Sequence, residues 1–285
     1  MESITDLEVL MSKKMATSLY RRELDLALHL VARTGFITKA CIRYITEDRG
    51  EAGNYRFIDA MNKSGMFQLW DLESPAWTLS ELGYLKAKDL GIRPVERPGE
   101  HSFFHQATVL NLALEFQRRG FVEAWAAHPE LEKQGSDRII IERGSNRRRY
   151  SDVVMRTRGP RSTQLAVQLE LKPKSHRRYK RILRGYMATT GISLLLIVHL
   201  NDRLPTVIEK LARRLKFPTE RIPILFVDLR DLFHDHESGP ARSKPDLEGF
   251  GRIISQIRSA LDRSNPVSSL NLSVGGNHGV RKQAG

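Results

Sequence analysis

The chain has 285 residues, 40% of them hydrophobic and 28% charged, which is enough for two compact domains with cores of ordinary size. Its net charge of +13 favours a nucleic acid as partner over an anionic membrane surface. The longest apolar run, at 192–200, is too short to cross a membrane, and the mixed, charged start excludes a secretory signal. A single cysteine, Cys41, excludes an intrachain disulfide, so the sequence predicts a cytoplasmic protein.

The N-terminal part of the chain predicts a small DNA-binding domain after a loosely ordered leader at 1–18. The expected elements are helices at 19–33, 38–45 and 55–63, strands at 66–72 and 77–79, and a helix that ends near Gly91. Three short helices followed by a β-ribbon are typical of a winged helix, so residues 19–92 are expected to place their third helix in the major groove. On this third helix, the side chains expected to contact bases or phosphates are Arg56, Asn62 and Lys63. The alternative is that these residues only form the solvated face of the helix.

Residues 93–101 contain Pro94, Pro98 and Gly99, a composition that predicts a linker to a second domain at 102–233. The expected order there is a helix at 105–119, strands at 138–142, 150–156 and 164–172, a helix at 175–189, a strand at 192–200, a helix at 206–216 and a strand at 223–228. This αβββαβαβ order indicates an α/β fold, a mixed sheet flanked by helices. An extension at 234–263 contains one more amphipathic helix, and residues 264–285 have the composition of a disordered tail.

Two acidic residues stand out in the second domain. Asp152 and Glu170 are the only acidic residues between Arg143 and Arg184, a stretch that contains fourteen Lys and Arg. Side chains at i and i+2 of a strand share a face, so Glu170 and Lys172 are expected to point the same way. Two carboxylates among so many positive charges indicate a site where a bound divalent cation acts on a polyanion.

On these residues the chain resembles the PD-(D/E)xK nuclease superfamily, over about 102–230. Asp152 stands at the family's second-strand acid, after Ser151 in place of the proline, and Glu170-Leu171-Lys172 stands at the ExK motif. With a winged helix in front, the chain is similar to bacterial plasmid replication-relaxation and conjugative mobilisation proteins. Gln168 stands where that smaller group often carries an acid.

The resemblance implies a restriction-endonuclease-like domain that uses Mg²⁺ or Mn²⁺. Asp152, Glu170 and the Leu171 carbonyl would hold the metal, which lowers the pKa of a bound water. Lys172 would position that water or stabilise charge on the phosphate, completing a catalytic set of Asp152, Glu170 and Lys172. Further candidates for the site are Glu115, Gln168 and Tyr186. The expected DNA contacts of this domain are Arg147, Arg148, Arg149, Lys174, Arg177, Arg178, Lys180, Arg181 and Arg184.

Structural interpretations compete with these roles. Asp152 would also serve as an ion-pair partner for arginines, and Glu170 with Lys172 as a charge pattern on an exposed sheet face. The sequence therefore predicts a DNA-binding protein of a plasmid or mobile element whose nuclease-like domain nicks DNA with Mg²⁺. The alternatives are a non-catalytic scaffold for DNA and for replication or relaxase proteins, and a transcriptional regulator. A homodimer is compatible with a winged helix, but no heptad or apolar seam specifies one.

Overall fold

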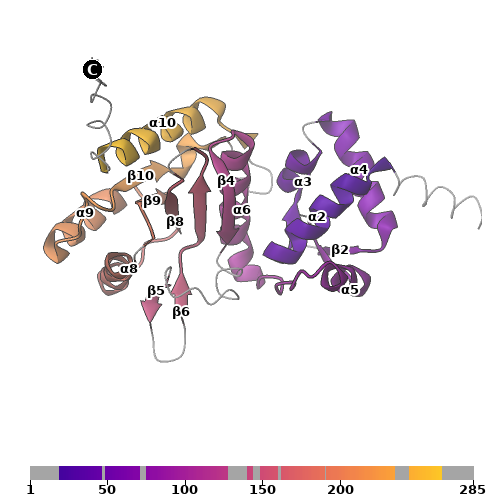
Figure 1. Cartoon of the computed structure of the whole chain (residues 1–285), viewed down its shortest axis with the longest axis horizontal. Coiled ribbons are helices and arrows are strands. Elements are labelled where there is room, and N and C mark those ends of the chain that lie inside the picture. The colour runs from indigo at the N-terminus through magenta and orange to yellow at the C-terminus, as the bar shows by residue number, and fades with distance from the viewer. Residues whose placement is uncertain are drawn as a thin grey trace, which may run out of the picture.

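The computed structural model describes most of the chain as a mixed α/β fold with helices around a five-stranded sheet (Figure 1). The described residues are 19–46, 49–70, 75–127, 140–143, 148–159, 162–189, 191–234 and 244–264. The expected leader at 1–18, the tail beyond Ser264 and Arg147 lie outside them. Within these ranges no helix combines the length and the apolar character that a bilayer crossing requires.

The first part of the chain, here the N-terminal unit (19–92), combines helices with a small antiparallel sheet of order β1-β3-β2. Its elements are α2 (Arg21–Thr34), β1 (Ile37–Thr38), α3 (Lys39–Ile45), α4 (Gly50–Ser64), β2 (Phe67–Trp70), β3 (Ala76–Leu79) and α5 (Glu81–Asp89). Helix α2 ends as expected at Gly35, whose φ of 85° is the left-handed conformation that glycine adopts without strain.

Helix α4 begins earlier than the pattern predicts. It starts at Gly50 rather than near Tyr55, so it includes Gly50 and Gly53, two residues of low helix propensity. Burial of Phe57 and Met61 against the core holds the later turns of the helix in place. Nearer its start, Asn54 Oδ1 accepts a hydrogen bond of 2.6 Å from the hydroxyl of Thr46, the residue after α3.

The second part, here the sheet unit (100–264), is built on a sheet of order β10-β9-β8-β7-β4. Its elements are α6 (Glu100–Arg118), β4 (Val122–Ala127), β5 (Ile140–Arg143), β6 (Arg148–Tyr150), β7 (Val153–Thr157), β8 (Gln164–Glu170), α8 (His176–Ala188), β9 (Leu194–His199), α9 (Leu204–Leu215), β10 (Ile224–Asp228), the 3₁₀ turn η2 (Leu229–Asp231), β11 (Phe233–His234), β12 (Lys244–Pro245) and α10 (Leu247–Ser264). Strands β8, β9 and β10 are parallel, whereas β7 and β4 run antiparallel to their neighbours.

The strand at the β4 edge of this sheet differs from the expected one. β4 pairs with β7, while the strand expected at 138–142 corresponds to β5, which pairs with β6 in a separate two-stranded sheet. β4 contains three alanines, which are depleted in strands, and a bulge between Val122 and Ala124 interrupts its alternation. Both features remove the period-two pattern by which a sequence predicts a strand.

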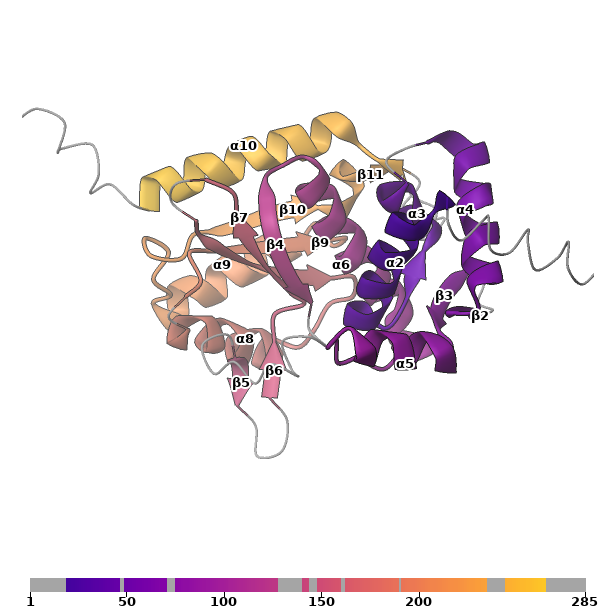
Figure 2. The same ribbon diagram turned by 45° about the vertical axis from the view of Figure 1, so that its right-hand side comes forward.

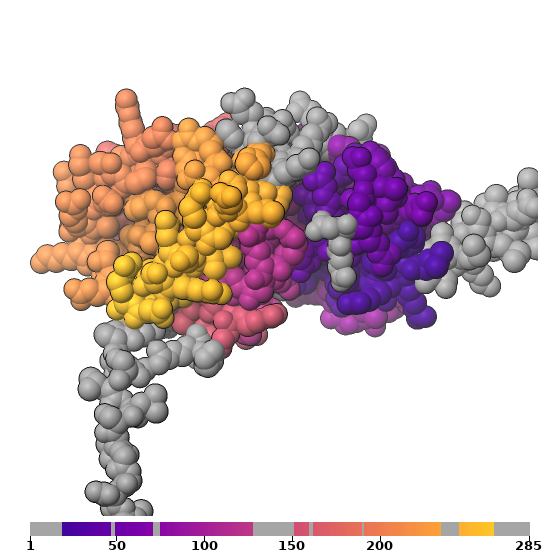
Figure 3. Space-filling model, turned by 90° about the horizontal axis from the view of Figure 1, so that it is seen from above, coloured from indigo at the N-terminus to yellow at the C-terminus, as the bar shows by residue number. Residues whose placement is uncertain are grey.

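Helices cover both faces of the sheet, as Figure 2 shows. Helices α6 and α10 pack on the face that carries Val153, Val167 and Leu196. Helices α8 and α9 pack on the opposite face, on Ala166 and Leu195. Seen from above, α10 forms part of the outer surface of the sheet unit (Figure 3).

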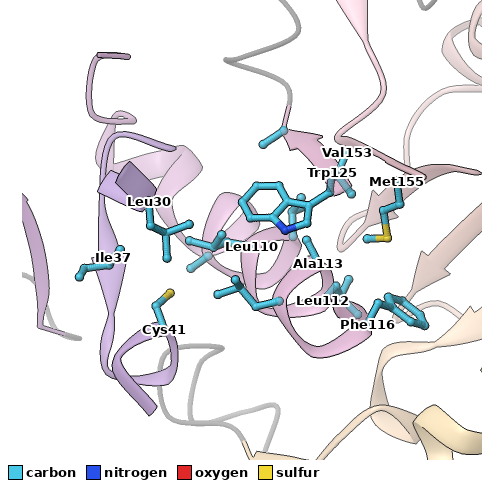
Figure 4. Packing of buried hydrophobic residues seen from close by; sticks show 14 of the residues in the cluster. Leu30, Ile37, Cys41, Leu110, Leu112, Ala113, Phe116, Trp125, Val153 and Met155 are labelled. Carbon is cyan, nitrogen blue, oxygen red and sulfur yellow. The ribbon is translucent and has the colours of Figure 1, made fainter. Parts of the chain in front are cut away.

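The two units share one hydrophobic core rather than meeting through a free linker. Figure 4 shows Leu30 of α2 and Leu110 of α6 packed towards Trp125 of β4. The guanidinium of Arg33 lies 4.7 Å from the centre of the Trp125 ring and donates a hydrogen bond of 2.6 Å to the Trp125 carbonyl. The segment expected as a linker also packs on α2, since Val95 N–H donates to the Ala32 carbonyl.

Candidate functional site

The two carboxylates singled out in the sequence lie where β7 begins and β8 ends. Asp152 immediately precedes β7, and its N–H donates to the carbonyl of Val167 on β8. Val153 pairs with Val167, which places Asp152 opposite Gln168. Gln168 and Glu170 are two residues apart on β8 and share the face that α8 covers, whereas Asp152 lies just before β7 at the end of the sheet, within reach of Gln168 and of His105 on α6.

Asp152 is held by hydrogen bonds within the protein. Its Oδ2 accepts from the Leu169 N–H at 2.7 Å and from Gln168 Nε2 at 2.8 Å. His105 Nε2 lies 3.5 Å from the same oxygen and 3.2 Å from the carbonyl of Leu169. Burial raises the pKa of Asp152, but its bonds to His105 and Leu169 outweigh burial and lower the pKa below the ordinary value.

His105 belongs to this site although its sequence context gave no reason to place it there. It lies on α6, and the contact with Asp152 forms only because α6 packs beside the end of β8. Burial lowers the pKa of His105, but the hydrogen bond with Asp152 and the charge of Asp152 raise it above the ordinary value overall. The pair therefore favours a charged histidine beside an ionised aspartate.

Glu170 is bound by a lysine other than the expected one. Lys174 Nζ donates to Glu170 Oε1 at 2.5 Å, with side-chain exposures of 20% and 2%. Lys172 is exposed instead, because β8 ends at Glu170 and the chain bends at Leu171 and Lys172, so strand alternation no longer applies. The expected ExK geometry is therefore replaced by an ion pair at i, i+4.

One oxygen of Glu170 remains unsatisfied. Oε2 is buried and has no hydrogen bond of normal geometry among the described residues, although the Tyr179 hydroxyl is near enough to the carboxylate for Glu170 to raise the pKa of Tyr179. Burial raises the pKa of Glu170, Lys174 opposes this, and the charge of Asp152 adds to it, so that the pKa is raised overall. An orphaned carboxylate oxygen inside a protein is costly, and it marks the point where a further cation or donor would be accommodated.

Tyr186 has a structural position in this region. It is fully buried, and its hydroxyl lies 3.0 Å from Ser151 Oγ, which is also buried. Burial raises the pKa of Tyr186. A side chain without exposed surface does not stack on a nucleobase, so Tyr186 fixes the residue before Asp152 to α8.

Glu115 does not join the carboxylates. It is ten residues from His105 along α6, which corresponds to about 15 Å along the helix axis. Its carboxylate is held by Arg118 at 2.9 Å and by Arg119 at 2.7 Å. Leu171 directly follows β8, and its side chain packs against the core.

Helix α8 gives this region a basic outer face. Its buried residues Tyr179, Leu183 and Tyr186 recur at helical spacing and face the sheet. The exposed residues on its other side are His176, Arg177, Arg181 and Arg184. Lys180 is half-buried, as is Arg178, whose Nε has no hydrogen-bond partner among the described residues.

The DNA-contact residues expected elsewhere have mixed environments. Arg56, Asn62 and Lys63 are exposed on α4. Lys63 pairs with Asp59 at 2.8 Å, and Asn62 Oδ1 accepts a hydrogen bond from the Trp77 indole at 3.2 Å. Arg148 and Arg149 lie in β6, of which only the main chain is described.

As they stand, the residues of this site do not fit a divalent cation. Mg²⁺ requires several oxygen ligands in an octahedral arrangement. Oδ2 of Asp152 is already hydrogen-bonded to two donors, and Oε1 of Glu170 is paired with an ammonium group. Across the described ranges, no three His, Cys, Asp or Glu side chains form a group suited to a metal.

A comparison of the chain with protein-family models gives no match, and a comparison with curated proteins gives none either. The functional interpretation therefore depends on the residues and the geometry described above.

Proposed function

We propose that this chain binds DNA through two surfaces, as a protein of the plasmid replication-relaxation or mobilisation kind. The observation that carries the proposal is the outer face of α8, where four basic side chains are exposed in a chain of net charge +13: His176, Arg177, Arg181 and Arg184. Such cations bind phosphates without reading sequence and release counterions when they do so. The nuclease-like sheet unit then serves mainly to hold the DNA backbone.

The N-terminal unit supplies the second surface as a winged helix. Its first three helices, α2, α3 and α4, and the β1-β3-β2 sheet support this assignment. Helix α4 would enter the major groove, with Arg56 and Lys63 exposed on it. Asn62 contributes less, because it already accepts a hydrogen bond from Trp77.

The test is a salt series of binding to a labelled DNA duplex, followed by fluorescence anisotropy. The double variant Arg177→Ala, Arg184→Ala removes two exposed cations of α8, and Arg213→Ala, Arg214→Ala removes two exposed cations of α9 as a matched control. If both α8 arginines contact phosphates, the slope of log K against log salt falls by about 2, at about 0.9 per phosphate. The control keeps the wild-type slope. Equal slopes in both variants, or no binding by the wild type at low salt, would refute the proposal.

A second candidate function is metal-dependent nicking of DNA, which the site does not fit as it stands and which would require Lys174 to leave Glu170. The observation in its favour is Oε2 of Glu170, which is buried and has no hydrogen-bond partner among the described residues. It is tested by incubating supercoiled plasmid with Mg²⁺ or Mn²⁺ and wild type or Glu170→Gln. Nicking by the wild type that disappears in the variant supports an endodeoxyribonuclease. Tight binding without nicking supports a non-catalytic scaffold. The pairing of Glu170 with Lys174 favours this second outcome.

A further inference from the structure

A lysine side chain already supplies a positive charge at the carboxylates of Asp152 and Glu170. Lys174 Nζ lies 2.5 Å from Glu170 Oε1. Its charge also lowers the pKa of Asp152, so the ammonium group acts on both carboxylates. Together with His105 beside Asp152, this ammonium group places positive charge where a shared metal would act on the same two side chains.

The position of Lys174 is fixed by its neighbours along the chain. The backbone N–H of Lys174 donates to the hydroxyl of Tyr179 at 3.0 Å. Pro173 before it restricts the backbone, and Ser175 after it caps α8 by accepting from the Arg178 N–H. Lys172, two residues earlier, is exposed. The side chain at 174, and not the one at 172, is thus directed into the site.

We propose that the ammonium group of Lys174 takes the place of a divalent cation at Asp152 and Glu170, and that a metal ion binds there only when this lysine is withdrawn or replaced. The inference concerns the regulation of the carboxylate site named in the proposed function and rests on that assignment. In this state the chain holds its carboxylates together without a metal. Oε2 of Glu170, which is buried and has no hydrogen-bond partner in the described part of the chain, is the oxygen that a metal would reach once Lys174 is displaced.

The experiment is a titration of the full chain with Mn²⁺ in the absence of DNA, followed by calorimetry and by the electron paramagnetic resonance signal of free Mn²⁺. Lys174→Ala is compared with wild type, with the matched control Lys172→Ala, and with the double variant Lys174→Ala, Glu170→Gln. Lys174→Ala is expected to bind one Mn²⁺ at least about tenfold more tightly than wild type, because losing one nearby positive charge favours a dication by more than that factor even in a water-like dielectric. Lys172→Ala and the double variant are expected to bind as weakly as wild type.

Thermal unfolding supplies a second measurement. Lys174→Ala leaves Glu170 buried without its ion partner, so its melting temperature is expected to fall and to rise again with Mn²⁺, while that of wild type does not respond. Should Lys174→Ala fail to fold, Lys174→Gln keeps a hydrogen-bond donor to Glu170 without the charge, and the same gain in Mn²⁺ affinity is expected.

The inference is overturned if wild type binds one Mn²⁺ as tightly as the Lys174 variants do, or if those variants gain no Mn²⁺ affinity over wild type. Since no DNA is present, these results are separate from those of the salt series. If the protein does not bind DNA but Lys174→Ala binds Mn²⁺ more tightly than wild type, the proposed function is wrong and the role assigned to Lys174 stands.

Discussion

The hydrogen bond between Tyr186 and Ser151 should behave as a coupled unit that holds Asp152 in place. Both residues are fully buried, and their oxygens lie 3.0 Å apart. Tyr186→Phe leaves the Ser151 hydroxyl without its partner, and Ser151→Ala leaves the phenol of Tyr186 without one. Each single substitution is expected to lower the free energy of unfolding by about 1 to 2 kcal/mol, the cost of an unsatisfied buried hydroxyl.

The double variant gives the decisive number. With both oxygens removed no unsatisfied hydroxyl remains, so the loss in the double variant should be smaller than that of either single variant and fall short of their sum by at least about 1 to 2 kcal/mol. Urea unfolding of the four proteins, followed by circular dichroism, measures this difference. Losses in the double variant that equal the sum of the two single variants would show that the two hydroxyls act independently, and the argument that α8 anchors the residue before Asp152 would fail.

Two further predictions concern pH and packing. The pKa of His105 is raised above its ordinary 6.5, and that of Asp152 is lowered below its ordinary 3.8. Their pairing therefore stabilises the fold fully between pH 3.8 and pH 6.5. This stabilisation is lost as the pH rises through the folded pKa of His105, and also as the pH falls through the folded pKa of Asp152. His105→Ala should therefore cost about 1 kcal/mol inside that window and less above it, which thermal melts across pH would reveal; a cost that does not change with pH would contradict the pairing. In α10, a Cβ at Gly249 would lie 1.7 Å from the Asp231 carbonyl oxygen, whereas one at Gly251 meets nothing within 4 Å. Gly249→Ala should destabilise by about 2 kcal/mol and Gly251→Ala should stabilise by about 0.5 to 1 kcal/mol in urea unfolding, and equal effects would count against this packing.

The order of elements in the sheet unit could be predicted because most of them carry a clear local signal. Strands β9 and β10 are short apolar runs between helices, and α8 begins at a Ser175 cap. The strand β4 could not be predicted, since its bulge and its alanines hide the alternation. Its place beside β7 is decided by burial of Trp125 in the core, which is a tertiary effect.

The candidate site was predictable only in part, for a related reason. Asp152 and Glu170 stand out by charge alone, and the pairing of β7 with β8 brings them to the same end of the sheet. The choice between Lys172 and Lys174 depends on where β8 ends, and a difference of two residues in a strand end decides which ammonium group reaches Glu170. His105 comes from a distant helix, and no local pattern connects it to Asp152.

The core that passes from Leu30 through Leu110 to Trp125 has a mechanical consequence. A segment that packs on α2 and donates a hydrogen bond to it offers no hinge between the two units. Under the proposed function, a duplex that contacts both α4 and α8 would therefore bind two surfaces whose distance from each other is fixed. Any bend would have to come from the DNA and not from the protein.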